Sequence, residues 1–304
     1  MLKFYTPDRK GKIEPYSYRS RARLVGKCIE NIGQAFNNDM VVLGRIHTEK
    51  DVESLRNNNI KYIHDICDNK WPMLEKLWSN TNKYATAITT TCFKLKELIE
   101  SKTNKPVFVI PDPTERDEEP VKFEPNPVRL NAVYYGSAGN LKQINWSNID
   151  LKNINLQIIT NEGPIKWSYK IQGEIVRQSD IVLLPVNNDH EMTMYKGHNR
   201  PVDALRQGRL VITNAKIPSW LLLQRFIWCG DINEGIKWAI NNPKEVKQKV
   251  EEGQKFVKNN VDSILPIGLQ IICNKNDDEK AVEIALALEN EFGEPELPDV
   301  TKFL

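Results

Sequence analysis

Residues 179–213, SDIVLLPVNNDHEMTMYKGHNRPVDALRQGRLVIT, connect two apolar runs through a polar loop and a short helical segment. Residues 181–185 and Leu210–Thr213 each predict a buried strand, because both are short, apolar and rich in β-branched side chains. Residues 201–207 predict a helix between them, since proline is tolerated in a first helical turn and Gly208 suits the left-handed position after the last turn. This order predicts a βαβ unit with parallel strands.

The loop before this helix is polar and cationic, with Lys196, His198, Asn199 and Arg200 close to the helix start. We expect Asn199 to cap the helix. Free backbone N–H groups and cationic side chains at a helix N-terminus attract anions, so the segment predicts a diphosphate-binding site. Asp203 falls within the first helical turns, where its carboxylate would reach a sugar hydroxyl.

This stretch resembles the nucleotide-sugar motif of GT-B glycosyltransferases, in particular the family-four-like group (group 1). The resemblance rests on residues 203–208 (DALRQG) followed by the strand 210–213 (LVIT). The usual motif has a second Glu eight residues before the acidic residue, and here that position is Tyr195. Lys196 and Asn199 look like the replacement found in divergent short members from phages and bacteria. An ordinary βαβ unit with a solvated loop is the alternative interpretation.

Composition places the chain among ordinary soluble proteins. It has 304 residues, 40% hydrophobic and 27% charged, which is long enough for two domains. A net charge of +2 argues against a strongly electrostatic nucleic-acid binder but leaves room for a local basic patch. The five cysteines include no CxxC pair, which predicts reduced thiols, a cytoplasmic location and no zinc site. We expect neither a signal peptide nor a transmembrane segment.

Strand and helix signals alternate along both halves of the chain. This alternation predicts an α/β fold with parallel sheets, and the resemblance implies two doubly wound Rossmann-like domains facing a cleft, as in GT-B enzymes. Predicted helices in the first half cover residues 18–35, 49–57, 71–79 and 92–101. The predicted domains are an N-terminal acceptor-side domain (1–112), a proline-rich linker (113–128), a nucleotide-sugar-binding domain (129–272), and a helix and tail that pack back toward the N-terminal domain (273–304).

Candidate catalytic residues lie in residues 62–68, YIHDICD, where a strand gives way to a loop. Asp65 and Asp68 are three residues apart, and His64 precedes them. Carboxylates at the end of a strand can bind hydroxyls, orient an acceptor or act as a base. The resemblance implies that such an aspartate pair faces the sugar. In the alternative interpretation, one aspartate caps the next helix and His64 packs under the loop.

Further donor-binding candidates follow two strands of the second half. Gly136 and Ser137 lie in residues 134–140, YYGSAGN, where a glycine turn lets the backbone approach a phosphate closely. The resemblance implies that this turn contacts the donor diphosphate or the transferred sugar. Thr160 ends the next strand, and we expect it to border the nucleotide base.

The region after the first strand is basic and supplies the tentative acceptor-binding residues. These are Lys10, Lys12, Tyr18, Arg19 and Arg23. The cations that follow at spacings of four share one helical face, which suits a phosphorylated or polyanionic acceptor such as a lipid phosphate, a phosphosugar or DNA. A solvated helix face is the alternative.

Taken with the resemblance, these features predict a glycosyltransferase that uses a nucleotide-diphospho sugar as co-substrate and needs no other cofactor. No DxD motif lies in a suitable loop, so we expect no metal, and the resemblance implies retention at the anomeric carbon. Modified phage DNA is one such polyanionic acceptor. A nucleotide-sugar epimerase-like enzyme and a catalytically degenerate GT-B-like binding protein are the alternatives. The sequence leaves the donor sugar, the base, the acceptor and the oligomeric state open.

Overall fold

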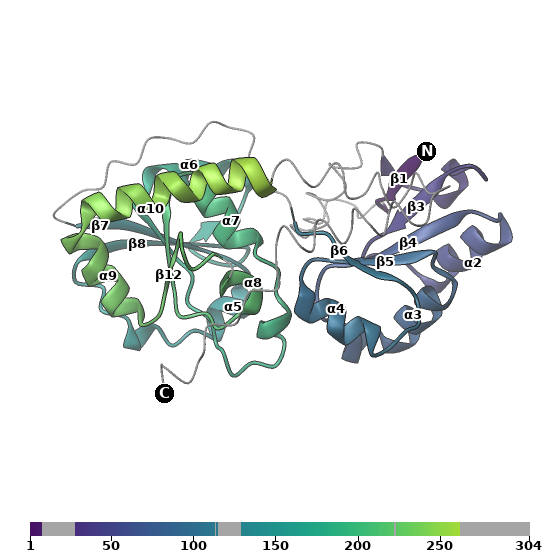
Figure 1. Cartoon of the computed structure of the whole chain (residues 1–304), viewed down its shortest axis with the longest axis horizontal. Coiled ribbons are helices and arrows are strands. Elements are labelled where there is room, and N and C mark those ends of the chain that lie inside the picture. The colour runs from purple at the N-terminus through teal and green to yellow at the C-terminus, as the bar shows by residue number, and fades with distance from the viewer. Residues whose placement is uncertain (8–27, 113, 115–128, 222, 262–304) are drawn as a thin grey trace. The chain divides into compact units, whose positions relative to one another are not determined.

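A computed structural model describes residues 1–7, 28–112, 114, 129–221 and 223–261 (Figure 1). The chain divides after Asp112 into two compact units, which we call the first unit (Met1–Asp112) and the second unit (Pro113–Asp262). Each contains a six-stranded sheet in which every pair of neighbouring strands is parallel. The predicted α/β class with two Rossmann-like domains is confirmed.

The first unit has the strand order β2-β1-β3-β4-β5-β6. Its strands are β1 (Leu2–Tyr5), β2 (Cys28–Ile29), β3 (Met40–Leu43), β4 (Lys61–Ile66), β5 (Ala87–Thr90) and β6 (Val107–Val109). Its helices are η1 (Ile32–Gln34), α2 (Glu49–Asn57), α3 (Trp71–Tyr84) and α4 (Phe93–Glu100). Since β3 to β6 follow one another in the same direction, right-handed crossovers put α2, α3 and α4 on one face. Figure 1 shows α3 and α4 on the same side of β4, β5 and β6.

The helix predicted over residues 18–35 is wrong in its last part, and its first part lies outside the described residues. Cys28 and Ile29 form β2, which pairs with β1. A short 3-10 turn follows, because the Asn31 side chain accepts a hydrogen bond from Gly33 N–H while the Gln34 side chain accepts one from Asn31 N–H. This capping box starts a new turn, so a continuous helix cannot run through the segment.

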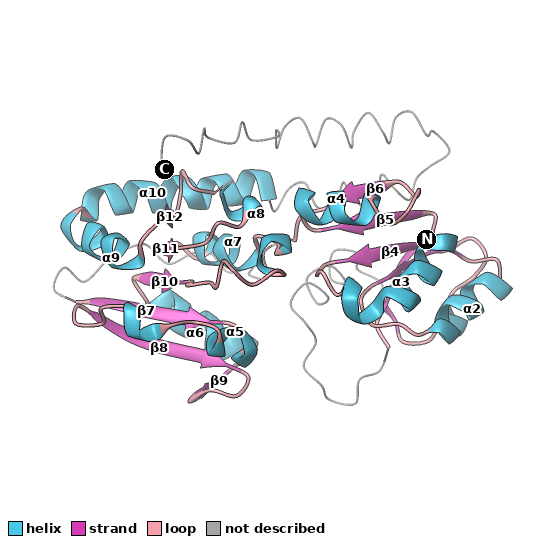
Figure 2. Ribbon diagram, turned by 90° about the horizontal axis from the view of Figure 1, so that it is seen from below, coloured by secondary structure: helices cyan, strands magenta, loops and turns pink. Residues whose placement is uncertain are grey.

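The second unit has the strand order β12-β11-β10-β7-β8-β9, which Figure 2 shows side by side. Its strands are β7 (Leu130–Tyr135), β8 (Ile154–Thr160), β9 (Ile165–Lys166), β10 (Ile181–Leu183), β11 (Leu210–Thr213) and β12 (Trp228–Cys229). Its helices are α5 (Ala138–Lys142), η2 (Trp146–Asn148), α6 (Tyr169–Gln178), η3 (Thr193–Tyr195), α7 (Asn199–Arg206), α8 (Pro218–Leu221), α9 (Ile232–Asn241), α10 (Pro243–Phe256) and η4 (Val257–Val261).

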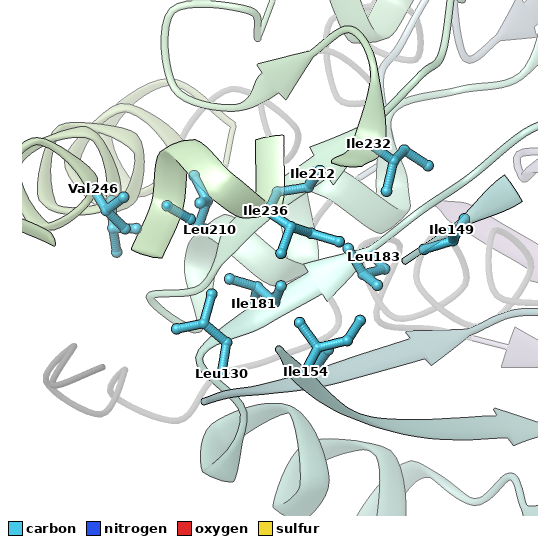
Figure 3. Packing of buried hydrophobic residues seen from close by; sticks show 13 residues of the cluster. Leu130, Ile149, Ile154, Ile181, Leu183, Leu210, Ile212, Ile232, Ile236 and Val246 are labelled. Atoms are coloured by element: carbon cyan, nitrogen blue, oxygen red, sulfur yellow. The ribbon is translucent and has the colours of Figure 1, made fainter. Parts of the chain in front are cut away.

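The core of the second unit is formed by alternate residues of its central strands. Ile181 and Leu183 point to the same face as their partners in β11, because side chains alternate across a strand. Ile236 of α9 packs onto this face, together with residues of α10 and of the segment before β8 (Figure 3). Gly235 lets α9 approach closely, since a Cβ atom there would lie 2.8 Å from Cγ2 of Ile212.

The predicted end of α7 is confirmed. Gly208 has a φ of 69°, in the left-handed region. Its N–H donates to the carbonyl oxygen of Leu205 at 2.9 Å, and Arg209 N–H donates to that of Ala204 at 3.0 Å. These two bonds form a Schellman motif. Among the described residues, no helix has both the length and the apolar character needed to cross a membrane.

Candidate functional site

The carboxyl end of β7 makes a tight turn through Gly136 and Ser137. A Cβ atom on Gly136 would lie 2.7 Å from the Tyr134 hydroxyl oxygen and 3.2 Å from Nη1 of Arg200, so a side chain does not fit without displacing them. Ser137 caps α5, its hydroxyl oxygen accepting a hydrogen bond from Asn140 N–H at 3.1 Å. The structure thus brings together Gly136 and Arg200, which the sequence placed in separate donor-binding segments.

Arg200 lies at the end of β7, although it belongs to α7. Its Nη1 donates to the Tyr135 carbonyl oxygen at 3.4 Å, and the Tyr135 hydroxyl donates to the Arg200 carbonyl oxygen at 2.8 Å. The centre of its guanidinium lies 5.3 Å from the centroid of the Trp220 ring. Arg200 is half-buried. A guanidinium has five N–H donors, so these contacts leave it able to bind an anion.

Tyr134 forms the buried floor beneath this turn. Its side chain has no exposed surface, and its ring packs edge-on against Trp146 with 5.5 Å between centroids. Burial raises the pKa of Tyr134, while the charge of Arg200 opposes the shift. The phenol therefore stays neutral near pH 7 and adds no negative charge to the site.

The start of α7 differs from the prediction in two ways. The helix begins at Asn199, and His198 is its N-cap without a capping hydrogen bond from its side chain, so the Asn199 cap is wrong. The Asn199 carboxamide oxygen instead accepts from Arg200 N–H at 2.9 Å, and Pro201 has no N–H. The N-terminus of α7 therefore offers fewer backbone donors than expected, and an anion here depends mainly on side chains.

Asp203 and Thr160 are buried, contrary to the expected contact with a ligand surface. Asp203 has no exposed surface and lies in the second turn of α7, which begins two residues earlier than predicted. Thr160 is 1% exposed, and its hydroxyl oxygen accepts from Glu162 N–H at 3.3 Å. Both side chains would need local movement to touch a nucleotide.

The loop before α7 is hydrogen-bonded to α8, a helix that the sequence did not predict. Ser219 Oγ donates to the Lys196 carbonyl oxygen at 2.6 Å, and Trp220 Nε1 donates to the Gly197 carbonyl oxygen at 2.9 Å. Trp220 is fully buried. The available signal was the apolar window that starts at Ser219, which contains a tryptophan whose N–H needs a partner when buried.

His198, the N-cap residue of α7, is a half-buried titratable group. Its Nε2 is buried and has no hydrogen-bond partner within the part of the chain that the structure describes. Burial lowers the pKa of His198 to about 4. The imidazole is therefore neutral near pH 7, and the positive charge next to the Gly136 turn comes from Arg200.

In the first unit, Asp65 lies inside the sheet and accepts bonds on both carboxylate oxygens. Thr89 Oγ1 donates to Oδ1 at 2.6 Å, and the Cys67 thiol donates to Oδ2 at 3.2 Å. The side chain is 1% exposed. A base must reach the proton that it removes, so this burial favours a structural or positioning role for Asp65.

His64 is buried in β4, between β3 and β5. Its Nδ1 lies 2.6 Å from Oδ1 of Asn82 on α3, and its ring packs edge-on against His47 and Trp78 at 5.1 and 5.7 Å between centroids. Burial, with a smaller contribution from the neighbouring His47, lowers the pKa of His64 to about 3. Neither Asp65 nor Asp68 caps α3, whose N-cap is Lys70.

Asp68 is the exposed member of the predicted catalytic set. Its side chain is 44% exposed and forms an ion pair with Arg45, whose Nη1 lies 3.1 Å from Oδ2. Arg45 follows β3 and Asp68 follows β4, so the carboxyl ends of two neighbouring parallel strands meet here. Sequence reasoning missed Arg45, since no local pattern marks it.

The tentative acceptor-binding residues lie outside the described residues. They are Lys10, Lys12, Tyr18, Arg19 and Arg23. Within the described ranges, no group of three or more His, Cys, Asp or Glu side chains is arranged to hold a metal ion.

No protein-family model and no curated protein matches this sequence. Solved structures do match it. One is WaaG, a glycosyltransferase involved in lipopolysaccharide biosynthesis, with a TM-score of 0.57 and 12% identity over 91% of this chain and 100% of WaaG. Another is an α,α-trehalose-phosphate synthase (UDP-forming) from Burkholderia xenovorans in complex with glucose-6-phosphate, with a TM-score of 0.59 and 7% identity over 85% of this chain and 78% of that one.

TarM has a TM-score of 0.57 and 11% identity over 79% of this chain, which spans 55% of TarM. These proteins share two Rossmann-like domains, each with a parallel sheet. The chain has the GT-B fold. At these identities the likeness concerns the fold, and the chemistry has to be argued from the site itself.

Within this GT-B chain, the turn at Gly136, the loop at Lys196 and the guanidinium of Arg200 belong to the second Rossmann-like unit. Ligands of doubly wound sheets bind beyond the carboxyl ends of the strands, and Gly136 directly follows the last residue of β7. Tyr195, at the position of the expected Glu, ends the 3-10 turn η3. The site therefore has cations but lacks that carboxylate.

Proposed function

We propose that the protein is a glycosyltransferase that transfers a sugar from a nucleotide-diphospho sugar to an acceptor. The observation that carries the proposal is the position of Arg200, whose guanidinium lies against the Gly136 turn at the end of β7 in a GT-B chain. A glycine turn and a guanidinium at the end of a parallel strand suit a diphosphate.

The names of the matching structures support this class of reaction. WaaG is described as a glycosyltransferase. A trehalose-6-phosphate structure from E. coli, with a TM-score of 0.55 and 11% identity, is bound with UDP-2-fluoro glucose. Nucleotide sugars of this kind are the donors that the proposal assigns to the second unit.

In the proposed mechanism, Arg200 and Lys196 bind the donor diphosphate and stabilise the charge that grows on it as the sugar departs. Preorganised cations in a partly buried site perform this task without a metal. We therefore propose metal-independent transfer, with retention at the anomeric carbon as the expected stereochemistry. The Ser137 turn completes the diphosphate site.

On the acceptor side we assign the acid–base role to Asp68, because it is the exposed carboxylate of the predicted pair. Asp65 would hold the strand end in place through Thr89 and Cys67. The basic residues that follow β1 suit a phosphorylated or polyanionic acceptor, and hydroxylated phage DNA is the most specific form of that proposal.

A thermal-shift panel of nucleoside diphosphates tests the donor site. A ligand at a hundred times its Kd stabilises the folded protein by about 2.7 kcal/mol, so one base should give a clear rise in Tm. The same ligand should give a much smaller rise with Arg200→Gln, and a reduced one with Lys196→Ala. A wild-type protein that responds to no nucleoside diphosphate contradicts the proposal.

A catalytically degenerate nucleotide-sugar-binding protein is the second candidate. It is favoured by the carboxylates: Asp65 and Asp203 are buried, and Tyr195 replaces the expected Glu. Hydrolysis or transfer from the nucleotide sugar that binds best discriminates the two. Binding without any release of nucleoside diphosphate, with and without candidate acceptors, would favour the degenerate protein.

A further inference from the structure

The helix α8 contacts the predicted diphosphate loop at three successive points. Ser219 binds the Lys196 carbonyl oxygen at 2.6 Å, and the Trp220 indole N–H binds that of Gly197 at 2.9 Å. The Trp220 ring lies under the Arg200 guanidinium at 5.3 Å. One short helix therefore fixes the backbone of one predicted ligand-binding residue and the side chain of another.

Trp220 is suited to hold these groups rigidly. It has no exposed surface, and its N–H is satisfied by Gly197, so its ring has a fixed orientation. Because it is buried, Trp220 cannot itself touch a ligand on the surface. Any effect it has on binding must pass through Arg200 and the loop.

Arg200 is constrained from the opposite side by Tyr135. The Tyr135 hydroxyl donates to the Arg200 carbonyl oxygen at 2.8 Å, and the Tyr135 carbonyl oxygen accepts from Nη1 at 3.4 Å. The guanidinium is thus held between the end of β7 and the face of an indole. An arginine in a single conformation loses less side-chain entropy when it binds an anion.

We propose that Trp220 is a positioning residue for the donor diphosphate, acting through the Arg200 side chain and the Lys196–Gly197 backbone. This inference rests on the proposed function. It adds a residue outside the nucleotide-sugar motif, in a helix that has no direct part in binding.

The test compares Trp220→Leu, Trp220→Phe and Ser219→Ala with a matched control, Trp238→Leu. Trp238 belongs to the same unit but stacks on Trp228, at 5.3 Å between ring centroids. The probes are inorganic pyrophosphate, the nucleoside diphosphate that binds wild type best, and the corresponding nucleoside, each measured by calorimetry. Tm is recorded for every variant.

We expect Trp220→Leu to weaken pyrophosphate and nucleoside diphosphate binding about tenfold, since it removes a cation–π contact and a hydrogen bond. Trp220→Phe keeps an aromatic face under Arg200, so it should lose only about threefold, as should Ser219→Ala. Nucleoside affinity should stay the same in all variants. Trp238→Leu should change no affinity, even if it lowers Tm.

Three results would overturn the inference, and they are distinguishable from one another. If wild type binds the diphosphate and Arg200→Gln strongly weakens binding, but Trp220→Phe, Ser219→Ala and folded Trp220→Leu bind as wild type, the positioning role is wrong and the proposed function stands. An equal loss of nucleoside and diphosphate affinity would likewise assign Trp220 a purely structural role. If wild type binds no diphosphate, the proposed function and this inference both fail.

Discussion

The two units differ in where the polar side chains near their central strands lie. In the first unit, β4 and β5 carry His64, Asp65 and Thr89 in fully buried positions, and each is hydrogen-bonded within the unit. In the second unit, the central strand β10 is apolar throughout, and the guanidinium of Arg200 lies beyond the end of β7. A buried polar group must be satisfied by the protein itself, so the first arrangement serves stability while the second leaves donors for a ligand.

The strongest test of this comparison concerns the two aspartates of the first unit. Asp68→Asn should leave nucleotide binding and Tm nearly unchanged and lower turnover by ~100- to 10,000-fold, the range for acid–base help. The main expected effect of Asp65→Asn is a lower Tm, because it places an amide, whose nitrogen cannot accept a hydrogen bond, next to the donors Thr89 and Cys67. Turnover per folded molecule and thermal unfolding separate the two effects. Wild-type turnover of Asp68→Asn would remove it from the mechanism.

Acid should destabilise the first unit through His64. Its folded-state pKa is about 3 and its ordinary value is 6.5, so between these limits the unfolded chain binds the extra proton. The free energy of unfolding should therefore be unaffected above pH 6.5 and fall by roughly 1.4 kcal/mol per pH unit below it, down to about pH 3. Hydrogen exchange of β4 amides between pH 7 and pH 4 measures this.

His64→Phe should flatten that pH profile, after allowance for its effect on stability at pH 7. In the second unit, His198 has a pKa of about 4, so its acid-sensitive window ends about one pH unit earlier. When the experiment is extended to pH 3, the loss at β10 amides should level off near pH 4 while that at β4 amides continues. An equal acid response in wild type and His64→Phe would assign the acid sensitivity to other groups.

Two arginines of the second unit should separate binding from stability. Arg200→Met should weaken nucleoside diphosphate binding by about 1.5–3 kcal/mol, the value of a charge-assisted contact, with little change in Tm. Arg209 is buried and donates to the carbonyl oxygens of Val176 and Arg177 at the end of α6. Arg209→Met should leave these carbonyls unpaired, cost on the order of 2–3 kcal/mol and lower Tm by several degrees.

Calorimetry and thermal unfolding of both arginine variants check this pair. The folded fraction of Arg209→Met should bind the ligand as wild type does. If Arg209→Met instead loses binding while Tm is unchanged, the division between structural and ligand-binding cations within the second unit is wrong.

The smallest expected effect comes from a pair of glycines at the β7 turn. Gly136→Ala puts a methyl group 2.7 Å from the Tyr134 hydroxyl and 3.2 Å from Arg200, so we expect about a tenfold loss of diphosphate affinity, or roughly 1.4 kcal/mol. Gly139→Ala is the matched control, because its Cβ atom would have Ser137 Oγ as nearest neighbour, at 3.9 Å. Equal affinities of the two variants would show that the turn does not contact the ligand.

Sequence periodicity was sufficient for most elements of the fold. The bounds of α2 and β11 agree with the prediction, because apolar spacing and turn residues act over a few neighbouring positions. The left-handed Gly208 is equally local, since a helix end of this kind depends on the backbone freedom of one residue. The resemblance in residues 203–213 likewise implied the GT-B fold that the structure confirms.

The candidate site is formed by residues that are distant from one another in the sequence. Tyr135 and Arg200 are 65 residues apart, Asp65 and Thr89 are 24 apart, and neither contact leaves a local pattern. The sequence by itself determined most of the strands and helices, and that Lys196 and Arg200 lie close to the start of α7. Only the tertiary structure decided that Asp65, His64 and Asp203 are buried and that Arg200 meets Gly136, because burial and pairing depend on how whole elements pack, while periodicity reports only which face of each element is apolar.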